Sequence, residues 1–464
     1  MPEGAFAEAL AEFLSPDTAS VDRLDALLSR HGVGIVAHFY MEPELQGVLS
    51  ACKSPHIRIS DSLVMADAAV KMCESGARHI VVLGVDFMSE NVRAMLDVAG
   101  FADVPVYRAV APSIGCSLAE SAESSAYSAY LAKAATVAKS SHVVYINTSL
   151  RTKALAHDRV PTITCTSSNV VETVLECFAE VPDGHVWFGP DTYMGQNLEV
   201  MLRELASRDD ATVRALHPRH DAASLAGALE RFHYFGQGNC VVHHLFGAEV
   251  VSIVERDYAE AFVTAHFEVP GEMFSVALAR QHRGLGVVGS TANILSFIGE
   301  RVAEQAKLGV AARLRFVLGT EAGMITSIAR SVQAALATCA TAGIEVEIIF
   351  PVAREAIAQT GDAELPIAPG PAAGEGCSTA GGCATCPYMR MNSLDALFEL
   401  LLGLDGPRER LVPHHPRHYQ ERIGARGVAE LGGEPILHMR HLQRHGALSE
   451  AFVRDIVTRN VTAP

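Results

Sequence analysis

The chain has 464 residues, of which 49% are hydrophobic and 19% are charged, and its formal net charge is −16. This composition fits a globular protein of about three domains and has too little charge for a disordered chain. The acidic balance argues against a nucleic-acid-binding surface, although a local basic pocket for a small acid stays open. The N-terminal residues carry acids where a secretory signal would be basic. No stretch reaches the ~18 uninterrupted apolar residues of a membrane span, so we expect a cytoplasmic protein without a membrane partner.

Short apolar runs that end in polar residues recur along the chain in three sets, in the same order. The runs lie at residues 34–40, 56–62 and 79–91, then at 142–148, 161–169 and 185–197, and finally at 261–270, 284–294 and 313–325. The step between the first two polar positions is 24 residues from His38 to Ser62, 22 from Tyr145 to Ser167 and 24 from His266 to Ser290. This regular spacing indicates an internal threefold repeat.

The repeat predicts an α/β fold. Continuous apolar runs are typical of parallel strands buried on both faces, and the Ala-rich and Leu-rich segments between them suit crossover helices. We therefore expect three αβα sandwich domains with parallel sheets in a pseudo-threefold triangle. The predicted boundaries are an N-terminal helical extension at 1–29, domains at 30–117, 118–243 and 244–386, and C-terminal helices with an extension at 387–464.

A cysteine follows each set of runs: Cys116, Cys240 and Cys386. If the three domains form a triangle, these cysteines would meet near its axis, whereas the alternative is three unrelated buried thiols. The Gly-, Pro- and Ala-rich segment 361–385 is expected to be an irregular loop that delivers Cys386. Thiolates favour iron–sulfur clusters, copper(I) or zinc, and a cluster with three protein ligands keeps one iron open as a Lewis acid.

The other cysteines are ambiguous. Cys383 and Cys386 form a CxxC pair, which also occurs in zinc ribbons and thiol redox sites. Cys377 and Cys383 could form a redox pair or simply line the loop. The remaining five are expected to be core residues because they lie in apolar or helical contexts: Cys52, Cys73, Cys165, Cys177 and Cys339.

Polar residues stand where the predicted strands end, which is where ligands bind in parallel sheets. They are His38, Tyr40, Ser62, Tyr145, Asn147, Ser167, His243, His266, Glu268, Ser290 and Thr291. Hydroxyl and amide groups at helix N-termini suit carboxylates and phosphates, while His and Glu can move protons. The set suits an anionic substrate that undergoes dehydration. Taken singly, each of these residues is more often a helix cap or a structural histidine. No GxGxxG follows a predicted strand, and neither GxxxxGK[ST] nor CxxxCxxC occurs, which disfavours nucleotide cofactors and radical chemistry.

The motifs AHFY, ISDS, GVDFMSEN, IGCSLAES, YINTS, TCTSSN, GPDTYMGQN, NCVVHH, HFE, GST, GTEAG and CPYMRMN occur in this order between about residues 30 and 405. This series resembles the quinolinate synthase family. The resemblance implies three αβα domains around a central 4Fe–4S cluster, one per chain. It also implies condensation of iminoaspartate with dihydroxyacetone phosphate to quinolinate, with loss of phosphate and water, in NAD biosynthesis.

The resemblance also assigns roles to single residues. The implied cluster ligands are Cys116, Cys240 and Cys386, and the implied acid–base or positioning groups are Tyr40, His243 and Glu268. The implied contacts to substrate carboxylates or phosphate are His38, Ser62, Tyr145, Asn147, Ser167, His266 and Thr291. The implied partners are L-aspartate oxidase or aspartate dehydrogenase as the iminoaspartate supplier, and the cluster-assembly machinery.

One departure points to a branch of the family. The usual bacterial His-Pro-Glu-Cys motif is replaced by residues 266–269, His-Phe-Glu-Val. Together with VPGEMF and GGCATCPYM, this resembles the plant-type branch, here expected without the sulfur-transfer domain that precedes plant enzymes. Phe267 replaces the proline of the bacterial motif, which affects the expected loop geometry, while His266 and Glu268 are retained.

Three other interpretations stay open from the sequence. The first is the diphthamide-forming class, which shares the plan of three domains and three cysteines. The second is an iron–sulfur sensor or electron carrier, and the third is a zinc protein. Residues 405–464 lie outside the resemblance, and their six histidines are compatible with a metal-binding tail. A solvated helical extension that packs on a domain or a partner is the favoured interpretation of this segment.

Overall fold

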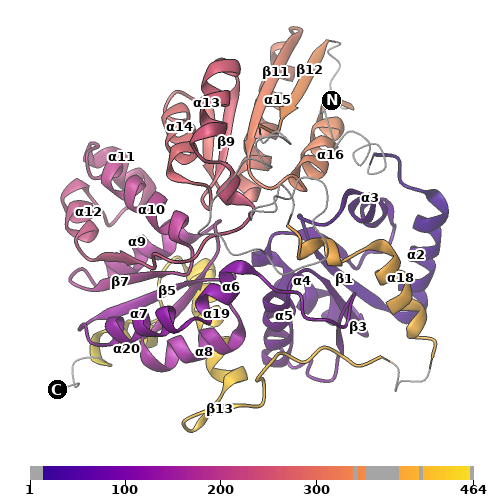
Figure 1. Cartoon of the computed structure of the whole chain (residues 1–464), viewed down its shortest axis with the longest axis horizontal. Helices are drawn as coiled ribbons and strands as arrows, with labels where there is room; N and C mark the ends of the chain where they lie inside the picture. Colours follow the sequence, from indigo (N-terminus) through magenta and orange to yellow (C-terminus); the bar gives the residue numbers. More distant parts are fainter. Residues whose placement is uncertain (1–13, 338–342, 352–385, 407–410, 460–464) are drawn as a thin grey trace. The chain divides into compact units, whose positions relative to one another are not determined.

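The computed structural model describes residues 14–337, 343–351, 386–406 and 411–459, and the chain divides into two compact units. Unit 1 comprises residues 1–115 and 241–414, and unit 2 comprises residues 116–240 and 415–464. Figure 1 labels their helices and strands. Within the described ranges, no helix combines the length and the apolar character that crossing a bilayer requires.

The same four-stranded parallel sheet occurs three times, twice in unit 1 and once in unit 2 (Figure 1). The strand orders are β2-β1-β3-β4, β6-β5-β7-β8 and β10-β9-β11-β12. The strands are β1 (Val33–His38), β2 (Ile57–Ser60), β3 (His79–Leu83), β4 (Val106–Arg108), β5 (Ser140–Tyr145), β6 (Thr162–Cys165), β7 (His185–Gly189), β8 (Phe232–Tyr234), β9 (Phe262–His266), β10 (Gly286–Gly289), β11 (Ala312–Gly319) and β12 (Ile344–Ile349). The predicted α/β class, with three parallel sheets flanked by helices, is confirmed. Each predicted apolar run contains a strand.

Each sheet also has a fourth strand that the sequence analysis missed: β4, β8 and β12. Two of them have only three residues, and none ends in the polar pattern that marked the other nine. The domain boundaries and the triangular arrangement stay predictions.

The helices of unit 1 follow the strands in βαβ order. They are α2 (Thr18–His31), α3 (Pro43–Ala51), α4 (Ser62–Glu74), α5 (Asp86–Val98), α13 (Ala248–Asp257), α14 (Gly271–Gln281), α15 (Thr291–Leu308), α16 (Met324–Ala337) and α18 (Leu394–Gly403), with 3-10 turns η1 (His243–Leu245) and η2 (Met389–Met391). Side-chain caps begin two of the helices that follow polar strand ends. Asp61 accepts the backbone N–H of Val64 at α4, and Ser290 forms a capping box with Asn293 at α15. These caps fix the turns that carry Ser62 and Thr291.

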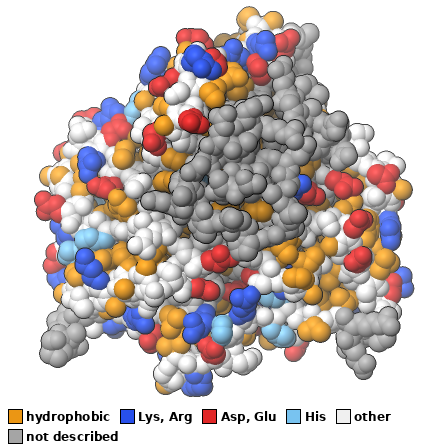
Figure 2. All heavy atoms as spheres, viewed as in Figure 1, with side chains coloured by type: hydrophobic (Ala, Val, Ile, Leu, Met, Phe, Trp, Pro, Cys, Tyr) orange, Lys and Arg blue, Asp and Glu red, His pale blue; other side chains and the backbone are white. Residues whose placement is uncertain are grey.

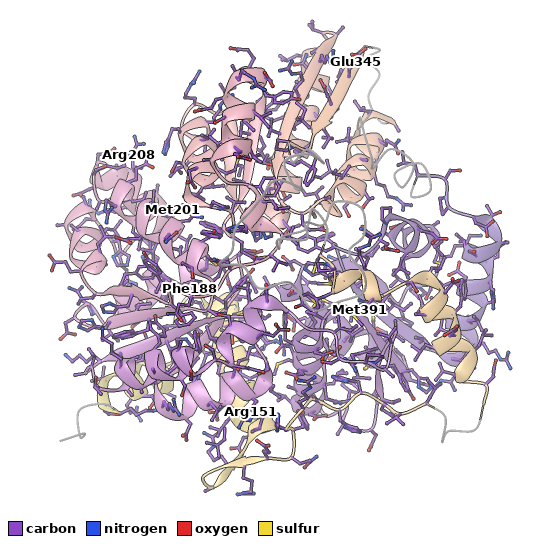
Figure 3. All side chains as sticks on the ribbon, viewed as in Figure 1. Arg151, Phe188, Met201, Arg208, Glu345 and Met391 are labelled. Carbon is purple, nitrogen blue, oxygen red and sulfur yellow. The ribbon has the colours of Figure 1, made fainter. Side chains whose placement is uncertain are left out.

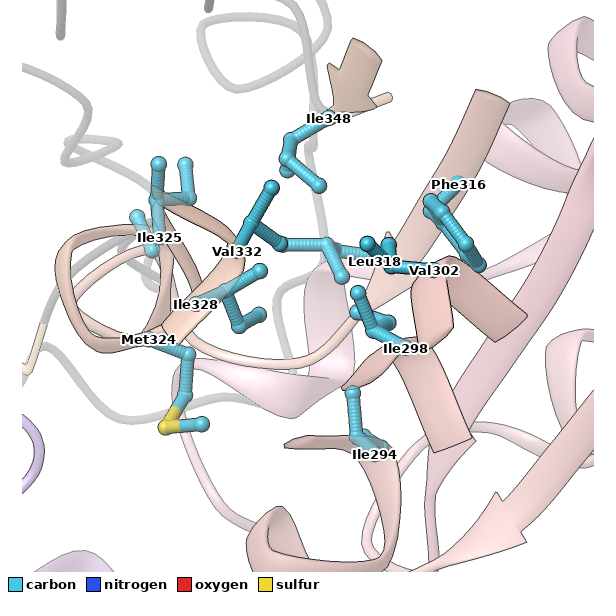
Figure 4. Close-up of a cluster of buried hydrophobic side chains, with 11 residues drawn as sticks. Ile294, Ile298, Val302, Phe316, Leu318, Met324, Ile325, Ile328, Val332 and Ile348 are labelled. Carbon is cyan, nitrogen blue, oxygen red and sulfur yellow. The ribbon is translucent and has the colours of Figure 1, made fainter. Parts of the chain in front are cut away.

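The core of the third sheet also holds part of the first βαβ region. Ile294, Ile298 and Val302 lie on one face of α15 at helical spacing and pack with residues of β11 and α16 (Figure 4). Phe39 and Tyr40, which follow β1, pack against the same cluster. Burial of this apolar surface fixes the loop after β1 beside the third sheet within unit 1.

Unit 2 is built from the middle sheet and the C-terminal helices. Its helices are α6 (Ser117–Ala122), α7 (Ser125–Ala135), α8 (Leu150–Arg159), α9 (Val170–Glu180), α10 (Thr192–Leu205), α11 (Asp210–Leu216), α12 (Ala222–Leu229), α19 (Val428–His445) and α20 (Glu450–Thr458), with a small hairpin of β13 (Arg422–Ile423) and β14 (Arg426–Gly427). Phe188, labelled in Figure 3, lies in β7 and is fully buried.

The surface view in Figure 2 shows acidic and basic side chains interspersed on the face that it presents.

The C-terminal helix α19 packs on α8, as expected for a helical extension. A Cβ at Gly432 would lie 2.4 Å from the backbone oxygen of Leu150, so only glycine allows this close approach. Glu434 pairs with the buried His157 at 2.9 Å, and the ring of His438 lies 4.3 Å from that of Phe452. The segment therefore contributes packing and ion pairs to unit 2.

Unit 2 contains a buried histidine whose neutral form the fold favours. His142 in β5 is fully buried, its Nε2 lies 2.9 Å from the hydroxyl of Tyr127, and burial lowers its pKa to about 3. As the pH falls below ~6.5, the unfolded chain takes up a proton at this site and the folded chain does not. The free energy of unfolding therefore falls by about 1.4 kcal/mol per pH unit until the pH approaches the folded pKa.

We predict that His142→Gln flattens this dependence. Urea unfolding of the full chain between pH 7 and pH 4.5, followed by fluorescence of the single tryptophan Trp187 in the same sheet, measures the slope. The expected slope of the variant is lower by about 1.4 kcal/mol per pH unit. Equal slopes for the two proteins would show that His142 is protonated in the folded state.

Candidate active site

Polar residues of unit 1 gather at the carboxyl ends of its strands. His38 is the last residue of β1 and His266 the last of β9, and both are almost fully buried. Ser62 and Thr291 are the first residues of the helices that follow the neighbouring strands β2 and β10. The structure therefore places these four predicted contacts at the strand ends where parallel sheets bind ligands.

A buried carboxylate lies between two histidines. An oxygen of Glu268 lies 3.1 Å from Nδ1 of His243, and its other oxygen lies 3.7 Å from Nδ1 of His266. The two imidazole rings stack with centroids 4.6 Å apart, and Nε2 of His243 lies 3.4 Å from the hydroxyl of Thr320. His243, His266 and Glu268 are at most 4% exposed as whole residues. This arrangement can move a proton between carboxylate and imidazole in a place with little water.

Tyr40 stands beside this group. Its hydroxyl lies 3.4 Å from that of Thr291, and its ring meets those of His38 and His243 at centroid distances of 4.5 and 6.4 Å. Burial, followed by the negative charge of Glu268, raises the pKa of Tyr40 well above its usual value of 10. The phenol therefore stays protonated and can donate a hydrogen bond.

The two strand-end histidines are neutral. Burial lowers the pKa of His38 to about 4 and that of His266 to about 3, and the nearby Glu268 acts in the opposite direction in both cases. Nδ1 of His38 accepts the backbone N–H of Tyr40 at 3.2 Å, and Nδ1 of His266 accepts that of Glu268 at 3.3 Å. These bonds place the remaining proton of each ring on Nε2, which can donate to a substrate oxygen.

Unit 2 presents a second group of predicted contacts. Tyr145 is the last residue of β5 and pairs in register with Cys165 at the end of β6, so Asn147 and Ser167 emerge from neighbouring strands. Tyr145 is buried, whereas Asn147 and Ser167 are half-buried. The structure thus places Tyr145, Asn147 and Ser167 at the carboxyl ends of the neighbouring strands β5 and β6.

A buried lysine, which the sequence analysis did not single out, binds the loop that follows β5. Lys153 of α8 is fully buried, and its Nζ donates to the backbone oxygens of Ile146 at 3.0 Å and Thr148 at 2.5 Å. Ile146 and Thr148 are the residues on either side of Asn147 in the chain. A lysine on the inner face of a predicted crossover helix was the available signal, because such positions are usually apolar.

The three cysteines assigned as ligands differ from the core cysteines in exposure. Cys116, Cys240 and Cys386 are half-buried, whereas Cys73, Cys165 and Cys177 are buried. Burial raises the pKa of each of these three core thiols, which makes them poor thiolates. Cys52 is only half-buried at the end of α3, so the prediction that it is a core residue was wrong.

The loops that carry the candidate ligands are held by hydrogen bonds. In unit 2, the hydroxyl of Ser117, next to Cys116, donates to the backbone oxygen of Asn239, next to Cys240, at 3.0 Å. In unit 1, the backbone N–H of Cys386 donates to the fully buried Glu321 at 3.2 Å. Burial raises the pKa of Glu321 to about 8, while the backbone N–H groups of Cys386 and Gly323 act in the opposite direction. Thiols that are accessible and held on ordered backbone fit the donor set of an iron–sulfur cluster.

Some predicted features lie outside the described residues. They are Cys339, Cys377, Cys383 and the irregular loop at 361–385.

Comparisons with known proteins agree with the family resemblance. A family model described as quinolinate synthetase A protein matches residues 22–413. Over 475 residues the chain is 51% identical to a protein named quinolinate synthase, chloroplastic, from Nicotiana tabacum, with 100% of this chain and 66% of the relative covered. A protein of the same name from Arabidopsis thaliana is 48% identical over 471 residues, with 98% of this chain and 65% of the relative covered. The quinolinate synthase of Nostoc punctiforme is 29% identical over 293 residues, with 63% and 68% covered.

The higher identity to plant proteins confirms the resemblance to the plant-type branch. The chain spans about two thirds of the length of these plant relatives.

Proposed function

Because the chain belongs to the quinolinate synthetase A family, we propose that it condenses iminoaspartate with dihydroxyacetone phosphate to form quinolinate, with loss of phosphate and water. The observation that supports this best is the buried group of Glu268, His243 and His266 beside the phenol of Tyr40. A dehydrating condensation needs groups that take a proton from carbon and give one to a leaving oxygen. A carboxylate, an imidazole and a protonated phenol within one buried site can supply both.

Each of the three groups has its own role in the proposal. An oxygen of Glu268 lies 3.1 Å from Nδ1 of His243, so this pair would act as base when a substrate C–H or N–H is deprotonated and as acid when hydroxide leaves. Tyr40, whose phenol stays protonated, would donate to a developing oxygen charge. Burial of Glu268 and His243 keeps these transfers out of reach of bulk water.

The contacts to the two substrates would come from the strand ends. Neutral His38 and His266 would donate from Nε2 to a carboxylate or phosphate. Ser62 and Thr291 stand at the first positions of α4 and α15, where backbone N–H groups favour an anion. From unit 2, the proposed contacts are Tyr145, Asn147 and Ser167.

The proposed cofactor is one 4Fe–4S cluster. Cys116, Cys240 and Cys386 would hold it, because they are the half-buried thiols on loops that hydrogen bonds hold in place. When bound, a cluster with three protein ligands supplies an open iron that acts as a Lewis acid toward substrate oxygen. The proposed partners are an enzyme that oxidises aspartate to iminoaspartate and the machinery that assembles clusters. The expected cytoplasmic location stays a prediction, since the names of the plant relatives describe those proteins as chloroplastic.

We expect the protein purified without oxygen to be brown and to contain about four irons and four sulfides per chain. It should form quinolinate from iminoaspartate and dihydroxyacetone phosphate. Cys386→Ser should lose both cluster and activity, whereas Cys73→Ser, at a buried cysteine in α4, should keep both. Iron and sulfide analysis with a quinolinate assay measures this. A colourless zinc protein, or a loaded cluster without turnover, would contradict the proposed function.

A further inference from the structure

The loops that lead to Cys116 and Cys240 are held in the same way. In unit 1, the backbone N–H of Asp86 donates to the oxygen of Ile114 at 2.9 Å, and the Asp86 carboxylate accepts the N–H of Ile114 at 3.0 Å. In unit 2, the backbone N–H of Thr192 donates to the oxygen of Gly238 at 2.7 Å, and the Thr192 hydroxyl accepts the N–H of Gly238 at 2.9 Å. In each case one residue binds both the backbone N–H and the backbone oxygen of a single residue in the loop. We call this pair of bonds a clasp.

The two clasps occupy similar places in the repeat, although Thr192 stands one residue after Asp191, the counterpart of Asp86 in the Gly-x-Asp segment. Asp86 begins the helix after β3, and Thr192 begins the helix after β7, the third strand of its set. Ile114 and Gly238 each stand two residues before a candidate ligand, Cys116 and Cys240. The same construction therefore appears at the same distance from a cysteine in two separate units.

The third repeat has a related contact. Glu321 follows β11, in the segment Gly-Thr-Glu that corresponds to Gly-Val-Asp at Asp86. One of its oxygens accepts the N–H of Cys386 at 3.2 Å, and the other accepts that of Gly323 at 2.7 Å. The side-chain amide of Asn392 donates to the backbone oxygen of Gly84, in the Gly-Val-Asp segment of the first repeat, at 3.2 Å.

The clasped loops are packed closely. A Cβ at Gly238 would lie 2.2 Å from the backbone oxygen of Pro190 and 2.7 Å from the hydroxyl of Ser121, so the peptide lies directly on the turn after β7. The Asp86 carboxylate also pairs with Arg108 and accepts from the hydroxyl of Ser113. Such bonds restrict where the following cysteine can lie, since two or three residues of extended chain reach only about 7–10 Å.

We propose that Asp86, Thr192 and Glu321 are positioning residues, one in each repeat, that hold the backbone of Cys116, Cys240 and Cys386 respectively in the ligand geometry. This inference deepens the proposed function, on whose assignment of the three cysteines it rests. Each residue acts on its own cysteine through the backbone and does not touch the reacting atoms.

Three variants each alter one positioning residue: Asp86→Ala, Thr192→Val and Glu321→Gln. Each has a matched control at a site remote from the three cysteines. Asp25→Ala removes a carboxylate that accepts the N–H groups of Lys53 and Ser54, Thr173→Val removes a buried hydroxyl in α9, and Glu176→Gln alters a buried carboxylate paired with His217. Thr192→Ser keeps the accepting hydroxyl and should behave as the unaltered protein.

The first readout does not need a cluster. In the cluster-free full chain, iodoacetamide labelling of each cysteine is followed by peptide mass spectrometry. We expect each variant to speed labelling at its own cysteine by about tenfold, the factor for loss of one hydrogen bond of ~1.4 kcal/mol, and to leave the other two within about twofold. Equal changes at all three cysteines, or equal changes in variant and control, would overturn the proposal.

The second readout is the rate at which an iron chelator bleaches the loaded protein. The three variants should lose their colour faster than their controls, and Thr192→Ser should match the unaltered protein. If the unaltered protein takes up no cluster, the proposed function fails, and the labelling pattern still decides for or against the clasps. If Asp86→Ala or Glu321→Gln does not fold, Asp86→Asn and Glu321→Asp replace them in the same labelling experiment.

Discussion

Glu268→Gln is expected to lower kcat about 10²- to 10⁴-fold while the iron and sulfide content stays unchanged. Glutamine keeps the size of the side chain and one accepting oxygen, but it cannot take up a proton at neutral pH. The oxygen 3.1 Å from His243 then loses its charge, and His243 loses its carboxylate neighbour. Steady-state rates of quinolinate formation, measured together with iron analysis on the same preparation, test this.

The chain offers a close control for Glu268. Glu176 in unit 2 is equally buried and pairs with His217 at 2.8 Å, but it lies in α9 and outside the candidate site. Glu176→Gln should reduce stability and leave kcat within about twofold, since it removes a buried ion pair that has no contact with substrate. A Glu268→Gln variant with normal kcat would exclude the carboxylate as a proton-transfer group. Loss of the cluster in that variant would instead assign Glu268 a structural role.

Lys153→Met is expected to lower the free energy of unfolding of unit 2 by about 2–4 kcal/mol and to raise KM for iminoaspartate at least tenfold. Methionine matches the lysine stem in length but leaves the backbone oxygens of Ile146 and Thr148 without their ammonium donor. Both oxygens are buried beside Asn147, so we expect the loop to move and Asn147 to lose its position. Urea unfolding followed by Trp187 fluorescence gives the stability, and initial rates give KM and kcat.

Two further substitutions separate charge from packing at this site. Lys139→Met removes a surface lysine of the same unit that pairs with Asp183, and it should change stability by less than about 1 kcal/mol and leave KM unaltered. Lys153→Arg should not restore function, because a larger guanidinium does not fit a site with no exposed surface. A Lys153→Met protein with unchanged KM would contradict the positioning of Asn147 by this lysine.

The strands that could be predicted from the sequence are those with both an apolar run and a polar end. β1, β5 and β9 satisfy this rule because a buried strand must end where backbone and side chains meet a ligand or solvent. The fourth strands fail it: β4 and β8 are short edge strands, and the candidate ligands Cys116 and Cys240 follow them only after a loop. The rule therefore detects strands with a polar residue at or directly after their end and overlooks short edge strands.

The candidate site could be predicted as a set of residues but not as a set of contacts. The sequence identified His243 and Glu268 as two separate candidates. It could not show that they pair, because the pairing depends on the position of the turn η1 beside the end of β9. Lys153 and Glu321 escaped notice because their partners are backbone atoms, and the sequence does not tell which peptide groups a side chain will reach. The segment Gly-x-Asp or Gly-x-Glu after the third strand of each set was the visible signal for two of the three positioning residues, Asp86 and Glu321.

The packing of α19 on α8 has a consequence for synthesis of the protein on the ribosome. About 270 residues separate the end of α8 at Arg159 from the start of α19 at Val428. At typical translation rates of 5–20 residues per second, this interval lasts roughly 14–54 s. During that time the apolar side of α8 at Ala154, which α19 later covers, remains open to solvent. Unit 2 is thus completed only when the last helices emerge.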